Sequence, residues 1–292
     1  MVPAKRYFRL EELAPGVLAA IDEGAGANAG VVFGSEAIAV IDSFYEAEAA
    51  TALLAEIRRR SALPIRYLVN THHHVDHVGG NAIFAAAGAT LIAQRQVAAW
   101  VRPENLRLLG GERISEAQRA RVQALQAPGI GYEQQMMLEL GGRQLWLRHA
   151  LGHTGGDTIA WLSDAQVFFM GDLFWRRAAP NLTDARLSDW IATLAAFEGH
   201  AGRFVPGHGE PGTAADVADF AGYLRRIDAL AQQALDEGLR GAAAEAQALE
   251  ALRASHGDWA YFKGLAPSGV RHALAERQGL KRVPPPLASP RW

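Results

Sequence analysis

The stretch NTHHHVDHVGGN, residues 70–81, places four histidines and one aspartate within six consecutive positions. It follows IRYLVN (65–70), an apolar run typical of a buried β-strand. Alternate side chains of an extended segment share one face, so we expect His72 and His74 to converge on one metal ion. His73 then points to the opposite face. The position inside the chain, after a strand and before Gly-Gly, favours a metal site over a chance or tag-like histidine run.

Asp76 and His77 follow where the chain must turn, and we expect them to address a second ion beside the first. Imidazole with carboxylate suits zinc or another first-row divalent metal. Two ions need further ligands, and three candidates stand where later β-like runs stop: His153 in LGHTGGD, Asp172 in FFMGD and His208 in VPGHGEPG. Each is next to a glycine, which lets the backbone approach a crowded site.

Other polar residues have weaker claims. Asp42 ends the run AIAVID, where it either supports the metal loop by hydrogen bonding or simply ends a strand. The sequence does not assign Asp157 a role. The remaining histidines are expected to be packing residues (His149) or surface residues (His200, His256 and His272) rather than ligands.

The order of apolar runs indicates a layered α/β domain. Short β-like runs fill residues 17–45, a helix with a basic C-terminal end is predicted at 47–60, and TLIAQ (90–94) is a further strand. The segment 95–135 is expected to be mostly helical. Later predictions are β-hairpins at 137–151 and 157–172, a helix at 187–199 with Ser188 as its N-cap, and a strand and loop at 203–209.

From about residue 214 the chain is rich in alanine and leucine at helical spacing, and no β-like run follows. It ends in RVPPPLASPRW, which predicts an extended tail. We therefore divide the chain into a catalytic domain at 1–213 and a helical C-terminal extension with an extended tail at 214–292. The sequence leaves three roles open for the extension: covering the site, forming a homodimer, or bracing the domain.

Composition excludes several classes of function. The chain has 292 residues, is 49% hydrophobic and carries a formal net charge of −2, so it shows no electrostatic footprint for nucleic acid or an anionic membrane. No apolar run approaches the roughly 18 residues of a membrane span, and the N-terminus lacks the apolar core of a signal peptide. We expect a cytoplasmic location, with a removed leader as the alternative. Cysteine is absent, which excludes thiolate catalysis and disulfides.

The residues above resemble, in order and spacing, the metallo-β-lactamase-fold hydrolases, over roughly residues 17–213. The motif H-x-H-x-D-H carries the resemblance, together with the later ligands. It implies an α/β (α+β) fold, a four-layer αββα sandwich with its metals at one edge, followed here by the C-terminal helices. The ligand set that the resemblance implies is His72, His74 and His153 for a first zinc ion, Asp76, His77 and His208 for a second, and Asp172 between them.

Two branches of that family are similar to different parts of the chain. THHHVDHVGGN is similar to the segment of glyoxalase II, whereas GHTGGDTIAWL, FFMGDLFW and PNLTDARLSDW resemble zinc β-lactamases. The second likeness implies that Asn181 contacts substrate. Trp175 stands where the best-known β-lactamases have a lysine that grips the substrate carboxylate, and Asp172 stands where they have a metal-binding cysteine. Arg176 or Arg177 replaces that lysine, or both are ordinary surface arginines.

The leading hypothesis is a dinuclear zinc hydrolase in which a metal-activated hydroxide attacks a small carbonyl substrate, namely a β-lactam, a lactone or a thioester. Asp76 is expected to act in catalysis as well as in ligation. The alternatives are a glyoxalase II-like thioesterase, a mononuclear iron oxygenase on the same fold and a non-catalytic metal-binding module. The expected partner is a small molecule, with neither nucleic acid nor membrane involved.

Overall fold

Two β-sheets form the centre of the molecule, which the computed structural model describes at residues 6–24 and 26–288. In this part of the chain the first sheet follows chain order, antiparallel from β1 to β4 and parallel from β4 to β7. Its strands are β1 (Phe8–Ala14), β2 (Val17–Asp22), β3 (Ala29–Phe33), β4 (Ile38–Ile41), β5 (Ile65–Val69), β6 (Thr90–Gln94) and β7 (Ile130–Tyr132). The second sheet has the order β12-β11-β10-β9-β8, and only β11 and β12 run parallel. Its strands are β8 (Gln135–Glu139), β9 (Gln144–Ala150), β10 (Asp157–Leu162), β11 (Val167–Trp175) and β12 (Arg203–His208).

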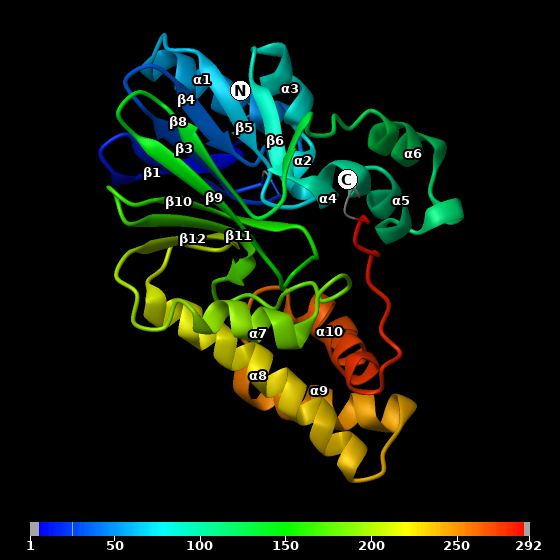
Figure 1. The fold of residues 1–292 in the computed structure, drawn as a ribbon. Helices are drawn as coiled ribbons and strands as arrows, with labels where there is room; N and C mark the ends of the chain where they lie inside the picture. The colour runs from blue at the N-terminus through cyan, green and yellow to red at the C-terminus, as the bar shows by residue number, and fades with distance from the viewer. Residues whose placement is uncertain (1–5, 25, 289–292) are drawn as a thin grey trace, which may run out of the picture.

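Helices cover the outer faces of both sheets, as Figure 1 shows. The first sheet is covered by α1 (Ala47–Arg60) and α3 (Asn81–Ala86), and the second by α7 (Leu187–Ala195) and α8 (Ala214–Asp236). The other helices are α2 (Val75–Val78), α4 (Arg95–Trp100), α5 (Pro103–Leu108), the 3-10 turn η1 (Gly111–Arg113), α6 (Glu116–Gln123), α9 (Gly241–His256) and α10 (Phe262–Arg277). This confirms the predicted four-layer αββα sandwich with C-terminal helices. No helix among the described residues is long and apolar enough to cross a membrane.

The alternation of side chains along β2 explains why the layers stack. Val17, Ala19 and Ile21 lie in the core between the two sheets, whereas Leu18 and Ala20 lie in the core under the helices. Successive side chains of a strand point to opposite faces, so a strand that is apolar at every position needs a cover on both sides. Each large aliphatic side chain buried in this way stabilises the fold by about 1.5–3 kcal/mol.

The C-terminal helices share a core with the sandwich. Phe174 of β11, Trp190 of α7, Phe220 of α8 and Val270 of α10 belong to one buried cluster. The indole Nε1 of Trp190 donates to the carbonyl of Leu173 at 2.9 Å, which locks α7 onto β11. The division of the chain at residue 213 stays a prediction, since this cluster runs across that boundary.

The N-terminus of α7 differs from the prediction. Ser188 is not its N-cap, because the helix begins at Leu187 after Arg186, which makes no side-chain cap. Instead Glu276 of α10 accepts the backbone N–H groups of Leu187 at 3.0 Å and of Ser188 at 3.3 Å. A carboxylate is favourable at the positive end of a helix, and this one comes from a distant segment. Sequence patterns also do not predict β1, or β7 within the segment expected to be helical.

The tail that follows α10 runs back to α4, as Figure 1 shows in red. Residues 278–288 contain neither helix nor strand, as predicted for the tail. Arg95 donates to the carbonyls of Leu287 at 2.5 Å and Ala288 at 2.8 Å, and the Leu287 N–H donates to Gln96 Oε1 at 3.1 Å. The end of the predicted tail, 289–292, lies outside the described residues.

Candidate metal centre

The histidine-rich stretch leaves the end of β5 and enters the short helix α2, at the edge of the first sheet. Thr71 fixes its start, because its N–H donates to Asp42 Oδ1 and its hydroxyl to Asp42 Oδ2, both at 2.7 Å. Asn70 fixes its end by donating from Nδ2 to the carbonyl of His77 at 3.1 Å. These bonds hold the histidines in one turn before any metal is considered.

A first group of ligand atoms comes from His72, His74, His153 and Asp172, and these atoms lie within 4.8 Å of one another. His153 Nε2 is 2.9 Å from His74 Nδ1 and 3.2 Å from Asp172 Oδ2, and His72 Nε2 is 3.7 Å from the same oxygen. Four ligands on a tetrahedral ion with bonds of about 2.0–2.1 Å lie about 3.3 Å apart. The observed separations bracket that value, so the group fits a zinc-sized ion.

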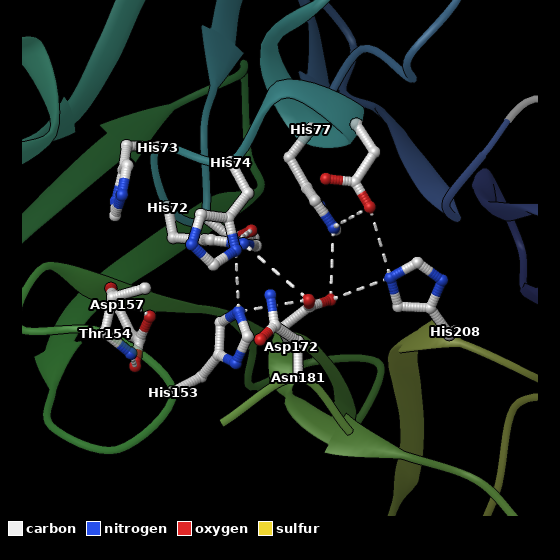
Figure 2. A network of polar contacts seen from close by, with 12 residues as sticks. His72, His73, His74, His77, His153, Thr154, Asp157, Asp172, Asn181 and His208 are labelled. Atoms are coloured by element: carbon white, nitrogen blue, oxygen red, sulfur yellow. Dashed lines mark hydrogen bonds and ion pairs between the residues drawn. The ribbon is translucent and has the colours of Figure 1, made fainter. Parts of the chain in front are cut away.

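A second group is formed by Asp76, His77 and His208. Asp76 Oδ2 lies 3.8 Å from His77 Nε2 and 3.4 Å from His208 Nε2. Asp172 Oδ1 faces the same two nitrogens, at 3.1 Å and 3.4 Å, while its Oδ2 faces the first group. Asp172 therefore stands between the groups (Figure 2), and the structure brings together all seven of the residues predicted as ligands.

Glycines allow Asp172 to reach this position. A Cβ on Gly207 of β12 would lie 1.9 Å from Asp172 Oδ1. Gly171 has φ +51, and a Cβ there would meet Thr71 Oγ1 at 2.5 Å. The strands β11 and β12 thus approach the histidine loop more closely than any residue with a side chain permits.

Several buried atoms of the centre have no hydrogen-bond partner among the described residues. Those that face the metal positions are His72 Nε2, His77 Nε2, Asp172 Oδ1 and His208 Nε2. A buried polar atom without a partner is costly, and here four such atoms point at one another. Metal coordination satisfies all of them, so the donor set fits one or more divalent cations.

The two groups differ in charge. Burial lowers the pKa of His72 well below its usual range and that of His153 to about 3, which keeps both imidazoles neutral and ready to ligate. Burial also acts on His77 and His208, but nearby carboxylates outweigh it. Asp172 is the largest of these influences; it raises the pKa of His77 well above the usual range and that of His208 to about 9. Metal uptake by the second group therefore has to release protons.

His73 points away from both groups, as predicted. Its ring packs edge-on against Trp100 with centroids 5.5 Å apart, and its Nε2 lies 3.4 Å from Asp184 Oδ2. The same carboxylate oxygen lies 3.2 Å from His74 Nε2. Arg107 of α5 donates to the other oxygen of Asp184. The sequence patterns do not mark Asp184, because it stands in a loop rather than at the end of a strand.

Asp42 and Asp157 do not face the metal positions but hydrogen-bond to a ligand or to the turn that carries one. Asp42 Oδ2 accepts from His77 Nδ1 at 2.7 Å, which fixes the ring so that Nε2 faces the metal position. Asp157 accepts the N–H of Thr154 at 2.8 Å and its hydroxyl at 2.5 Å, and so shapes the turn that carries His153. Burial raises the pKa of Asp157 to about 8. Of the two roles that the sequence left open for Asp42, the structure supports hydrogen bonding to the metal loop.

The residues predicted to contact substrate lie at the same edge, in different settings. Asn181 Oδ1 accepts the N–H of Thr183 at 3.0 Å and its hydroxyl at 2.7 Å, which leaves the amide nitrogen to donate elsewhere. Trp175 is buried and stacks on His208 with centroids 4.0 Å apart. Arg177 pairs with Asp258 at 2.6 Å. A substrate contact for these residues stays a prediction.

The other histidines lie outside the centre. His200 is exposed, as predicted. His256 and His272 are half-buried, and neither belongs to a group of ligand atoms, as predicted. The ring of His256 packs edge-on against Tyr223 and Trp259, which belong to the buried cluster shared by the sandwich and the C-terminal helices.

The profile of the metallo-beta-lactamase superfamily matches residues 23–208 of the chain. The chain belongs to this superfamily. It is similar to acyl-coenzyme A thioesterase MBLAC2 from Bos taurus, with 29% identity over 64% of this chain and 74% of the relative, and to the Homo sapiens protein of the same name, with 28% identity over the same shares. The solved structure of a metallo-beta-lactamase from Pontibacter korlensis has a TM-score of 0.61 and 20% identity, covering 75% of this chain and 99% of that one, which shows the shared fold. The superfamily and these relatives support assignment as a hydrolase.

Proposed function

We propose that this protein is a dinuclear zinc hydrolase that cleaves thioesters of the acyl-coenzyme A type. The observation that carries the proposal is the pair of ligand groups that share Asp172, with one carboxylate oxygen facing each group. The similarity to acyl-coenzyme A thioesterases supports the substrate class. A structural zinc site closes four ligands around one ion, whereas here seven residues surround two neighbouring positions that share one carboxylate, which is the arrangement of a two-metal hydrolytic site.

The residues divide the work. His72, His74 and His153 hold the first ion, Asp76, His77 and His208 hold the second, and Asp172 lies between the two. Bound ions supply Lewis acidity and lower the pKa of a water molecule to near neutrality.

Asp76 is placed to orient that water and accept its proton. Its side chain is 27% exposed, compared with 2% for Asp172, so it faces the side from which substrate and water enter. Asn181 offers its amide nitrogen to the carbonyl oxygen on which negative charge develops.

The arginines favour a thioester over a β-lactam. A β-lactam carries a carboxylate, and an unpaired cation suits its recognition. Arg177 is already paired with Asp258, and Arg176 donates to Asp216 at 2.9 Å and to the carbonyl of Pro211 at 2.6 Å. The acyl half of a hydrocarbon thioester carries no carboxylate, so it needs no such partner beside the scissile bond.

Metal analysis and a substrate panel test the proposal. We expect two zinc ions per chain, and hydrolysis of hexanoyl-coenzyme A in preference to a cephalosporin, a homoserine lactone, a glutathione thioester and a phosphodiester. His74→Ala should lower turnover at least about a hundredfold, because it removes a ligand, while His200→Ala, at an exposed position, should match the wild type. One iron per chain, or a cephalosporin or the glutathione thioester as the best substrate, would reject the assignment.

A further inference from the structure

Tyr261 brings the C-terminal extension to the metal centre. It precedes α10, and its ring centroid lies 6.0 Å from that of His208 and 6.0 Å from that of Trp175. Both contacts are edge-on, and the side chain is 51% exposed. An aromatic ring that touches a predicted metal ligand and also faces solvent lies at the entrance of the site. The sequence patterns do not mark this residue.

The loop that carries Tyr261 is attached to the segment that follows β11. Ala260 N–H donates to the carbonyl of Arg177 at 2.9 Å, and Ala179 N–H donates to the carbonyl of Ala260 at 2.9 Å. The side chains of Arg177 and Asp258 close the same loop with an ion pair of 2.6 Å. The extension is thereby held against the second metal position at a defined point.

The backbone of this loop is strained in a way that favours a functional role. Tyr261 has φ 59 and Arg177 has φ 50, both in the left-handed region. Residues with a Cβ adopt this region at a cost, and such strain tends to persist where the surrounding structure holds a functional group in place. At this residue the ring of Tyr261 lies edge-on to that of His208.

The surroundings of the Tyr261 hydroxyl define what it recognises. It makes no hydrogen bond with any of the described residues, and the residue is exposed to solvent beside His208. A phenol without a partner in the protein is free to donate a hydrogen bond to a ligand. The matching ligand group is an acceptor such as an amide carbonyl.

We propose that Tyr261 is a substrate-binding residue that packs on, and donates a hydrogen bond to, the thiol half of the thioester substrate. This rests on the proposed function. In an acyl-coenzyme A with a plain hydrocarbon acyl group, the amide carbonyls lie only in the pantetheine arm of the thiol half. The hydrocarbon acyl half has no acceptor other than the thioester carbonyl, which the proposed function assigns to Asn181, so the phenol donor finds its acceptor on the thiol side of the scissile bond.

Two substrates and two variants test the inference. Tyr261→Phe removes only the hydroxyl, and Tyr261→Ala also removes the ring. With hexanoyl-coenzyme A we expect Tyr261→Phe to raise KM about twofold to tenfold, the range of one net hydrogen bond, and Tyr261→Ala to raise it further, with kcat nearly unchanged. With S-ethyl hexanethioate, which has no amide, Tyr261→Phe should match the wild type.

Binding supplies a readout that does not depend on turnover. The thioether S-hexyl-coenzyme A, which cannot be hydrolysed, should bind each Tyr261 variant more weakly than the wild type when titrated calorimetrically into the zinc-loaded protein, and Tyr261→Ala should lose more affinity than Tyr261→Phe. Leu280→Ala is the matched control, because it removes an exposed apolar side chain of the same extension (69% exposed). Thermal unfolding of each variant verifies that it is folded.

The possible results separate the two proposals. Unchanged KM and unchanged thioether binding in both Tyr261 variants overturn the inference while leaving the thioesterase intact. An equal rise in the KM of Tyr261→Phe for hexanoyl-coenzyme A and for S-ethyl hexanethioate also overturns the inference, because the hydroxyl then does not contact the thiol half. A wild-type protein that neither hydrolyses hexanoyl-coenzyme A nor binds the thioether refutes the proposed function, and the inference with it.

Discussion

Asp42 links the histidine loop to the proposed second metal position, and Asp42→Asn tests that link. Three donors converge on its two oxygens: the N–H of Thr71 on Oδ1, and the hydroxyl of Thr71 with His77 Nδ1 on Oδ2, each at 2.7 Å. An amide of the same shape offers one accepting oxygen and one donating nitrogen. At least one of the three donors must then face another donor, whichever way the amide turns.

The backbone adds nothing to this effect, because Asp42 has φ 58 and asparagine tolerates the left-handed region at least as well as aspartate. Leaving one buried donor unsatisfied costs about 1–3 kcal/mol of unfolding free energy. Loss of the carboxylate that orients a metal-binding histidine weakens metal binding about 10–100-fold, or about 1.4–2.8 kcal/mol. We therefore expect Asp42→Asn to weaken the binding of the second zinc ion about 10–100-fold and the binding of the first only slightly.

Stepwise removal of zinc by a competing chelator measures both affinities. Asp184→Asn is the reciprocal control, because Asp184 Oδ2 lies 3.2 Å from His74 Nε2, in the first group. Asp184→Asn should weaken the binding of the first zinc ion and leave the affinity for the second unchanged. The reasoning is refuted if Asp42→Asn leaves both affinities unchanged, or if it weakens the first ion more than Asp184→Asn does.

Three further predictions concern the bridge, the pH dependence of zinc uptake and the tail. Gly207→Ala should displace Asp172 and lower zinc content and turnover, because the new Cβ would lie 1.9 Å from Asp172 Oδ1. Gly222→Ala is the control and should retain zinc content and turnover, because a Cβ there would have nothing within 4 Å. Equal zinc content in the two variants contradicts the prediction. Because the pKa of His208 is raised to about 9, the apparent zinc affinity of the second position should rise at least about tenfold per pH unit from pH 6 to 8, and a flat titration argues against it. Burial lowers the pKa of Lys281 from 10.5 to about 8, so the unfolded chain binds more protons between these values. Urea unfolding at pH 8 and pH 10 should therefore show the free energy of unfolding of the wild type rising with pH relative to that of Lys281→Met. Across the full interval between the two pKa values the gain is at most about 3 kcal/mol. A difference between the two proteins that does not change with pH contradicts the lowered pKa of Lys281.

Local sequence determined the elements that depend on short-range pattern. The helix predicted at 47–60 is α1 with the same bounds, and the strand predicted at 90–94 is β6. The histidines of residues 72–77 and the glycine-flanked His153 and His208 were likewise candidates from the sequence, because each follows or ends an apolar run. Asp172 was also a candidate, but the strand expected to stop there continues to Trp175, so Asp172 lies inside β11. An apolar run indicates where a strand ends, and the family resemblance implies which of the polar residues found there bind metal.

Only the tertiary structure decided which residues support the ligands and which reach the entrance. Asp184 lies 110 positions from the histidine to which it bonds, and Glu276 lies 89 positions from the helix N-terminus that it caps. Tyr261 contacts His208 because a loop of the extension is attached beside β11. Contacts of this kind arise when layers pack against one another, and neither member of a pair carries a local pattern that names its partner. The candidate metal ligands could therefore be predicted from the sequence, whereas the residues around them depend on how the helical extension packs against the sandwich.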